Sequence, residues 1–286
     1  MGEFDENPND NVNYKDYLGD NPSEDLNTQI KEELESMDVI EEDSDSSLNN
    51  MGNDELLEQQ GYDESYDEDV EGTGNLTDTN EEFQPYPEMS TEMGDPYREW
   101  GQQVWNDASD KEKRVIDWYT SPNGYVYMNE VERGIDNPNL SEEQKNMCRD
   151  ACETLAGVID RNECPQDAKV YRCIGGSETQ EIIDAFNNSK DKIIEHKGFM
   201  SGSVTENGAR GFSKSIMYED KEFTPVMRIN TPKGTPSISI AGSKNFGGSE
   251  GEVLFQRNTM YEINNITKVE DPVRKNYLYI DCSIKK

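Results

Sequence analysis

Residues 249–263 read SEGEVLFQRNTMYEI, and this stretch decides how the second half of the chain is expected to fold. Glu250 and Glu252 stand two residues apart at the entry to a short apolar run, which is typical of a β-strand. Residues i and i+2 of a strand share a face, so both carboxylates are expected on the same side. Two like charges this close tend to raise the pKa of one of them. Surface glutamates explain such a pair as readily as a catalytic site does, so the surrounding motifs have to decide.

Similar short runs on both sides of this stretch predict further strands. They are separated by Gly, Pro and Asn turns and cover residues 168–174, 196–203, 223–230, 237–241, 252–256, 260–270 and 276–284. The last alternates well, with Leu278, Ile280, Cys282 and Ile284 on one face. Helices are predicted before the strands, because apolar residues recur with helical period over 96–105, 110–120, 125–134 and from Ser141 to Ile159.

Capping boxes support several of these helices. Ser109 with Glu112, and Ser141 with Gln144, have the required spacing of three. A box of Ser177 and Gln180 predicts one more helix over 177–188, between the first two strands. Helices first and antiparallel strands later indicate an α+β fold rather than a parallel doubly wound sheet.

The charge divides the chain into two parts. Residues 1–95 hold 31 acidic and two basic side chains, a net charge of −29, while residues 96–286 hold 30 acidic and 25 basic ones, a net charge of −5. Residues 1–95 have little apolar area to offset the entropy of ordering, so we expect a largely disordered acidic tail with no core residues before Pro96. Such a tail repels nucleic acid.

One segment of the tail deviates from this pattern. Leu26, Ile30, Leu34 and Met37 recur at helical spacing after Ser23. Two interpretations stay open, a transient helix in a solvated tail and a short helix that folds in the groove of a partner.

Several classes of protein are excluded. A single histidine, His196, rules out zinc sites with two or more His ligands and is itself expected to be structural or at the surface. Rossmann and P-loop motifs are missing, no window approaches 18 apolar residues, and the first residues carry no ordinary secretory signal. Five scattered cysteines favour reduced thiols and a cytosolic setting over a disulfide framework.

Polar residues occur at three places where a strand should be apolar. Arg172 lies inside VYRCI, Ser201-Gly202-Ser203 ends the strand KGFM, and the glutamate pair enters VLF. Each also has an ordinary explanation: an edge position for the arginine, a turn for the serines, and surface exposure for the glutamates. The loop before the glutamates, GSKNFGGS, carries a single aromatic residue, Phe246, among three glycines.

Taken in order, these motifs resemble the mono-ADP-ribosyltransferase toxin family. Tyr119-Thr120 and Asn129 come first, followed by VYR, GFMSGS, INTPKG and SEGEVLFQRNTMYEI. More narrowly, the chain resembles the arginine-modifying branch that includes the iota-toxin and vegetative insecticidal ADP-ribosyltransferases. The family signature is an Arg on one strand, Ser-Thr-Ser on a second and Glu-x-Glu entering a third. The resemblance covers roughly residues 99–284, so the domains are expected at 1–95 for the tail and 96–286 for the catalytic domain.

The resemblance implies a fold and a set of roles. Two facing antiparallel sheets would form a cleft for NAD⁺, with the N-terminal helices alongside and no metal. Arg172 matches the arginine that binds the NAD phosphates, Ser201 the serine that positions the catalytic glutamate, and Glu252 that glutamate. Glu250 matches the residue that engages the acceptor, and Phe246 lies in the target-recognition loop.

Two departures from the family pattern stand out. Gly202 replaces the middle Thr of the serine motif, which we expect to loosen that strand end. After Phe212, itself a candidate NAD contact, the basic residue on the phosphates is expected to be Lys214, with Arg210 as a competitor.

The chemistry is consistent with these roles. Cleaving the nicotinamide–ribose bond builds positive charge on the ribose, which a carboxylate stabilises, and the departing pyridinium needs no general acid. A protonated guanidinium is a poor nucleophile, so a second carboxylate has a use in orienting it and accepting its proton.

The hypothesis is therefore an NAD-dependent protein-arginine ADP-ribosyltransferase. It would act as a monomer in the cytosol on an unidentified target protein, without contacting membranes, and phage or specialised delivery is a plausible setting. One alternative is a virion or effector protein whose transferase fold is degenerate and whose acidic tail does the binding. Another is an enzyme that is mainly an NAD glycohydrolase.

Overall fold

The computed structural model describes residues 83–90, 95–121, 123–212, 214–243, 251–271 and 275–285. The predicted tail helix after Ser23, the loop residue Phe246 and the upstream glutamate Glu250 all lie outside these ranges. The first four described helices are α3 (Pro96–Asp107), α4 (Asp110–Tyr119), α5 (Gly124–Arg133) and α6 (Glu142–Asp160). They match the predicted helices closely.

Local sequence signals explain where these helices begin and end. Both predicted capping boxes form: the backbone N–H of Ser109 donates to Glu112 at 2.8 Å, and that of Ser141 donates to Gln144 at 2.8 Å. Helix α5 ends at Gly134, whose φ of 70° is the left-handed conformation that glycine adopts easily. The prediction of a capping box formed by Ser177 and Gln180 is wrong. Helix α7 (Gly176–Asn188) begins one residue earlier, and Gly175 caps it without a side-chain bond.

The strands build a mixed sheet. They are β1 (Ala168–Cys173), β2 (Ile193–His196), β3 (Met200–Ser203), β4 (Ile216–Tyr218), β5 (Lys221–Thr231), β6 (Ser237–Ser239), β7 (Glu252–Phe255), β8 (Thr259–Val269) and β9 (Tyr277–Ile284). The hydrogen-bonded order is β2-β8-β9-β5-β1-β3-β7-β6, with β4 attached to β5. The predicted strand over 196–203 is in fact the end of β2 and all of β3. Strand β4 and the short helix α8 (Glu206–Arg210) were not predicted.

The α+β class is confirmed, and the pairing refines the expected two antiparallel sheets. Strands β5 and β9 run parallel, while the other ladders between strands are antiparallel. The path is continuous, but β1 and β3 share only one residue pair, Tyr171 with Ser203. This junction divides the sheet into a large group, β2-β8-β9-β5-β1, and a small group, β3-β7-β6.

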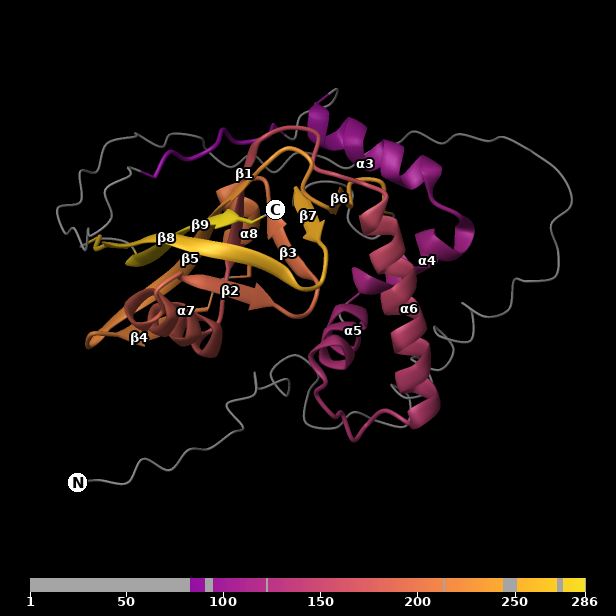
Figure 1. The fold of residues 1–286 in the computed structure, drawn as a ribbon, viewed down its shortest axis with the longest axis horizontal. Coiled ribbons are helices and arrows are strands. Elements are labelled where there is room, and N and C mark those ends of the chain that lie inside the picture. The colour runs from indigo at the N-terminus through magenta and orange to yellow at the C-terminus, as the bar shows by residue number, and fades with distance from the viewer. Residues whose placement is uncertain are drawn as a thin grey trace, which may run out of the picture.

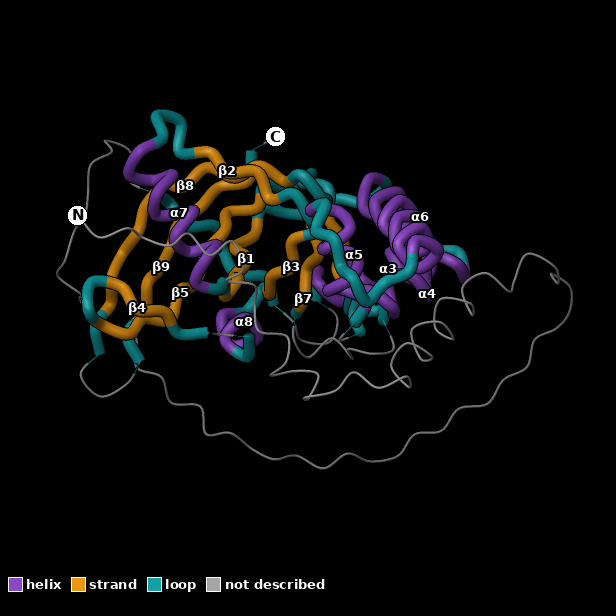
Figure 2. The backbone as a smooth tube through the Cα atoms, turned by 90° about the horizontal axis from the view of Figure 1, so that it is seen from below, coloured by secondary structure: helices purple, strands orange, loops and turns teal. Residues whose placement is uncertain are grey.

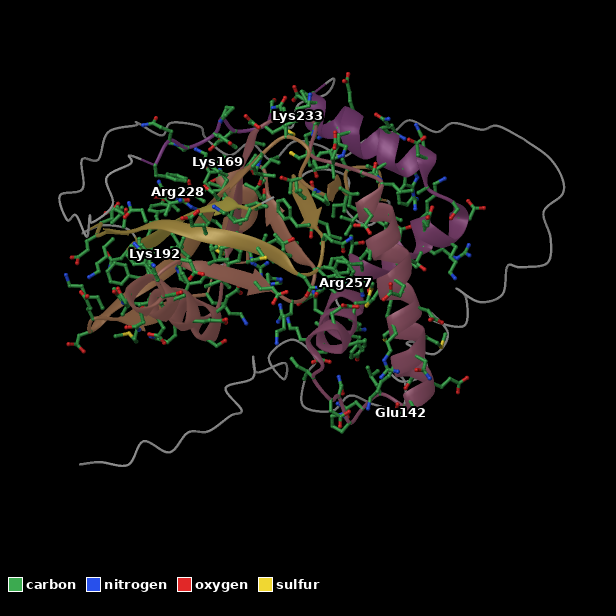
Figure 3. All side chains as sticks on the ribbon, viewed as in Figure 1. Glu142, Lys169, Lys192, Arg228, Lys233 and Arg257 are labelled. Carbon is green, nitrogen blue, oxygen red and sulfur yellow. The ribbon has the colours of Figure 1, made fainter. Side chains whose placement is uncertain are left out.

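Helices α3 to α6 gather beside the small group, and α7 lies beside the large one; Figures 1 and 2 show both from two directions. The apolar face of α6, with Cys148, Cys152 and Leu155, is buried as predicted. Arg257 follows β7 and donates to Glu132 of α5 and to Glu153 of α6, at 2.7 and 2.8 Å, which ties the sheet to the helices (Figure 3).

Strand β9 alternates as predicted, except that Asp281 is buried. It accepts two hydrogen bonds from Arg228 of β5, at 2.7 and 2.9 Å. All five cysteines are free thiols. Among the described residues, no helix has the length and apolar content needed to cross a bilayer.

The segment 83–90 packs against the sheet, so the prediction that no core residue precedes Pro96 is wrong. Met89 is only 1% exposed and belongs to the main hydrophobic core. The backbone N–H of Lys169 donates to the Pro87 carbonyl at 2.8 Å, and the Tyr171 hydroxyl donates to Glu88. Net charge identified the acidic part of the chain, but three apolar or aromatic residues among acids gave too weak a signal to show that this stretch is anchored.

A chain beginning at Pro96 should therefore be less stable than one beginning at Phe83. Losing Met89 from the core costs about 2–4 kcal/mol, because burial of a large apolar side chain is lost and a void remains. Denaturant midpoints of the two truncated chains and the full chain measure the difference. Equal midpoints for the Pro96 and Phe83 versions would show that segment 83–90 contributes nothing to the fold.

Candidate active site

Arg172 lies on β1 at the junction of the two strand groups. Its Nη1 donates to the Ser201 carbonyl of β3 at 2.8 Å, and its Nη2 forms an ion pair with Glu178 at 3.3 Å. The third nitrogen, Nε, is buried and has no hydrogen-bond partner. Arg172 is therefore not the outward-facing edge residue of the ordinary interpretation. It is a cation whose side chain is only 17% exposed and whose Nε is still unused.

The serine motif and Glu252 meet across the β3–β7 ladder. The register places Ser203 opposite Glu252, and Ser201 opposite Leu254. Ser201 is thus a diagonal neighbour of Glu252, and its backbone carbonyl holds Arg172. Ser203 is buried, and its hydroxyl accepts from the Thr205 backbone N–H at 3.1 Å. The backbone carbonyl of Glu252 accepts a bond from the Tyr97 hydroxyl of α3 at 2.9 Å, which fixes the start of β7 against the helices.

Residues of the early helices reach the same place. The Tyr119 hydroxyl at the end of α4 accepts from Asn129 Nδ2 at 3.2 Å. Burial raises the pKa of Tyr119 and the nearby carboxylate of Glu252 raises it further, while Arg172 acts in the opposite direction. The neutral phenol therefore lies within electrostatic range of both predicted site residues. Asn129 Oδ1 is buried and has no hydrogen-bond partner.

His196 is buried beside this group, at the end of β2. Its Nδ1 lies 2.8 Å from the Gly198 carbonyl, and Arg133 Nη2 lies 3.3 Å from its Nε2. These contacts fit a neutral ring that donates through Nδ1 and accepts at Nε2. Burial and, to a smaller extent, the positive charge of Arg172 together lower the pKa of His196 to about 4. The expectation of a structural histidine agrees with this setting.

Sequence reasoning missed two charged residues of the site, Glu178 and Arg133. Glu178 lies in the first turn of α7, where acidic residues are common for helix-dipole reasons, so it gave no separate signal. Its Oε1 is buried without a partner, like Arg172 Nε and Asn129 Oδ1. Three unsatisfied polar atoms in one region suit a polar ligand that offers both donors and acceptors.

The predicted residues after β3 lie apart from one another. Arg210 donates to Glu206 at 2.6 Å and stacks on Tyr277, on the face of β1 that carries Tyr171. Because neighbouring residues of a strand face opposite ways, Arg210 lies on the side away from Arg172. Phe212 is 64% exposed, and Lys214 is exposed in the loop before β4.

A cavity of about 380 Å³ lies on α3 and α4, away from the Arg172 junction. Its lining residues are Trp105, Asp110, Lys113, Arg114 and Asp117, none of which is a predicted site residue. Within the described ranges, no group of three or more His, Cys, Asp and Glu side chains could hold a metal ion.

Gly202 has a steric role that the sequence did not reveal. A Cβ at this position would lie 2.6 Å from Val170 Cγ1 and 2.8 Å from the Tyr171 carbonyl oxygen. Gly202 therefore lets β3 approach β1 at the single residue pair that joins the two groups. The expectation that the missing Thr loosens this strand end is wrong, because the glycine permits close packing here.

Restoring the family's residue with Gly202→Thr should lower the free energy of unfolding by about 1–3 kcal/mol, because the clash includes a backbone atom that cannot move away alone. Urea denaturation measures the loss. Gly157→Ala in α6 is the matched control, since its Cβ would meet only one atom, at 3.9 Å, and the helix favours alanine. A Gly202→Thr protein as stable as the wild type would contradict the close approach.

A candidate site for a polar ligand thus lies where the two strand groups meet. It brings together Arg172 of β1, Glu252 at the start of β7 and the Tyr119 phenol at the end of α4. Comparison with protein families gives a match over residues 95–286 to the ADP-ribosyltransferase exoenzyme model. The chain belongs to this family. A search of curated protein sequences gives no match.

Solved structures of ADP-ribosylating toxins share the fold. The toxin BECa of C. perfringens, solved with NADH, is 20% identical with a TM-score of 0.51; the match covers 66% of this chain and 48% of that one. This chain thus spans about half of BECa. Vis from Vibrio splendidus, solved with agmatine, is 18% identical with a TM-score of 0.50, covering 66% and 81%.

Proposed function

We propose that this protein is an NAD-dependent mono-ADP-ribosyltransferase that modifies arginine on a target protein. The observation that carries the proposal is the largely buried side chain of Arg172, which keeps a buried and unused Nε at the junction where Glu252 begins β7. A planar guanidinium with a free donor suits a pyrophosphate, which it can bind through two parallel hydrogen bonds.

In this proposal, Arg172 holds the pyrophosphate of NAD⁺ and so fixes the ribose near Glu252. When the nicotinamide–ribose C–N bond breaks, nicotinamide leaves with the bonding electrons as a neutral molecule, and positive charge develops on the ribose. The Glu252 carboxylate stabilises this charge. The phenol of Tyr119 lines the site as a neutral polar group, because its raised pKa keeps the proton on the hydroxyl.

The acceptor half of the reaction is assigned to Glu250. A guanidinium nitrogen of the target arginine forms a bond to the ribose, and the proton that it loses passes to the Glu250 carboxylate. The agmatine in the Vis structure carries a guanidinium group and supports the choice of arginine for this chain. Phe246 is proposed to contact the target. For the phosphates, Lys214 is preferred to Arg210, which lies on the other face of β1 with Tyr277.

The site of action is proposed to be the cytosol, which suits five free thiols. The direct test of the arginine assignment is transfer of labelled ADP-ribose from NAD⁺ to agmatine by the purified full chain. The product should be released by neutral hydroxylamine, as expected for an arginine-type linkage. Nicotinamide release without any agmatine product would favour the NAD glycohydrolase alternative. Release of neither product would favour the degenerate-fold alternative.

Arg172→Ala should weaken NAD⁺ binding by roughly 10–100-fold, since a hydrogen bond to a charged group contributes about 1.5–3 kcal/mol. The turnover of bound NAD⁺ should change less, because the role of Arg172 is phosphate binding. Arg172→Lys should restore little of the NAD⁺ affinity, since an ammonium group cannot form the two parallel hydrogen bonds of a guanidinium. Titration calorimetry measures the affinities. Arg161→Ala is the control, a more exposed arginine at the C-terminal cap of α6. Unchanged affinity in Arg172→Ala would reject the assignment.

A further inference from the structure

The ion pair between Arg172 and Glu178 occupies Nη2, the nitrogen that would bind pyrophosphate together with the unused Nε in the two-bond contact of the proposed function. Arg172 Nη2 and Glu178 Oε2 are 3.3 Å apart. After β1 the chain turns at Ile174–Gly175, and the first turn of α7 brings Glu178 back to the guanidinium. The same side chain that would bind pyrophosphate is therefore already paired with an internal anion.

The Arg172–Glu178 pair makes fewer hydrogen bonds than the Arg228–Asp281 pair between β5 and β9. Arg228 binds Asp281 through Nε and Nη2 to the two carboxylate oxygens, at 2.7 and 2.9 Å. Arg172 instead makes one contact to Glu178, leaving its own Nε and the Oε1 of Glu178 buried without partners. A structural pair that had to be as strong as possible would use both oxygens. The Arg172–Glu178 contact is a weaker one that a better ligand can displace.

We propose that Glu178 is a positioning residue that holds Arg172 in the ligand-free protein and competes with the pyrophosphate of NAD⁺ for its Nη2. This inference rests on the proposed function and deepens it, because it names what sets the affinity for NAD⁺. Binding then exchanges one anion for another on Arg172, and the Glu178 carboxylate stays close to the incoming phosphates.

The charges around Glu178 support this exchange. Burial is the largest single influence on the pKa of Glu178 and acts to raise it, but the charge and hydrogen bond of Arg172 and the charge of Arg133 lower it and leave the pKa below its ordinary value, so the carboxylate stays ionised. His196 is neutral at neutral pH because its own pKa is lowered to about 4. The remaining neighbour, Tyr261 of β8, is a phenol whose pKa burial and Glu178 raise. Glu178 is therefore the anion that neutralises Arg172.

The Arg172–Glu178 ion pair also stabilises the protein when no ligand is bound. A guanidinium that is largely removed from water is less stable without a counter-ion than with one. Glu178 supplies that counter-ion in the free protein, and the same charge repels an anionic ligand. Stability without NAD⁺ and affinity for NAD⁺ are thus expected to change in opposite directions when Glu178 is neutralised.

The test is ligand binding to full-length protein carrying Glu178→Gln, made in a Glu252→Gln background so that NAD⁺ is not consumed. Calorimetry with NAD⁺, ADP-ribose, inorganic pyrophosphate and nicotinamide separates the phosphate contribution from the rest. Glu178→Gln should tighten the three phosphate ligands by about tenfold, the expected size of removing one like charge at this range, and leave nicotinamide unchanged. Glu181→Gln, an exposed carboxylate one turn further along α7, should change nothing.

Several results would overturn the inference. Weaker binding of pyrophosphate and ADP-ribose by Glu178→Gln would show that Glu178 orients Arg172 rather than competing with the ligand, and unchanged binding would show that it does neither. Should Glu178→Gln fail to fold, as judged by circular dichroism, Glu178→Asp withdraws the carboxylate by one carbon and should tighten the same three ligands to a smaller extent. A parent protein that binds neither NAD⁺ nor ADP-ribose would instead reject the proposed function itself.

Discussion

Glu252→Gln should reduce both NAD⁺ hydrolysis and ADP-ribosyl transfer by about 10²–10³-fold, the usual cost of removing one dominant electrostatic stabiliser. The amide keeps the shape and hydrogen-bonding capacity of the glutamate but loses the charge opposite the ribose. The start of β7 should not move, because its anchor is the backbone carbonyl of Glu252, bonded to Tyr97. Initial rates of nicotinamide release and of label transfer to agmatine measure the two losses.

The matched control for this variant is Glu222→Gln, an exposed carboxylate on β5 outside the site. It makes the same chemical change and should leave both rates as they are. NAD⁺ affinity should stay within a few-fold of the wild type in Glu252→Gln, since the phosphates are assigned to Arg172. A Glu252→Gln protein that keeps more than a tenth of its hydrolysis rate would mean that another group stabilises the ribose cation.

Glu250→Gln should separate the two activities. Water reaches the ribose cation with little help, whereas a protonated guanidinium has to be oriented and deprotonated, so transfer needs the second carboxylate and hydrolysis does not. Transfer to agmatine should fall by about 10²-fold, in the range of a lost general base, while nicotinamide release stays within a few-fold of the wild type. The ratio of the two rates in one reaction mixture is the measurement.

The opposite result for Glu250→Gln is equally informative. If hydrolysis falls as far as it does in Glu252→Gln, the two carboxylates act as one catalytic unit. The assigned division of roles would then be wrong, and the inference of arginine specificity would lose its mechanistic support.

Periodicity predicted the elements with strong local signals. The capping boxes at Ser109 and Ser141, and the alternation of Leu278, Ile280 and Cys282, agree with the structure because each depends on neighbours in the sequence. Pairing between distant strands has no such signal, so the parallel β5–β9 ladder was missed. The anchored segment around Met89 was missed for the same reason: its contacts are to Lys169 and Tyr171, far along the chain.

Sequence reasoning identified some residues of the candidate site and missed others, and the reasons are physical. Arg172 stood out because arginine is rare within a buried strand, and Ser201 proved to hold it through a backbone carbonyl, which no side-chain pattern reveals. Glu178 looked like an ordinary acidic residue at a helix start. Gly202 looked like a lost hydroxyl, although the approach of two strands requires the glycine.

Identification of the modified residue in a target protein tests the central claim most directly. The full chain is incubated with labelled NAD⁺ and a cell lysate, with Glu252→Gln as the parallel reaction, and labelled proteins are mapped by mass spectrometry. The account predicts ADP-ribose on an arginine side chain in the wild-type reaction, removed by neutral hydroxylamine and missing with Glu252→Gln. Label on a different residue type, or equal labelling by the variant, would contradict it.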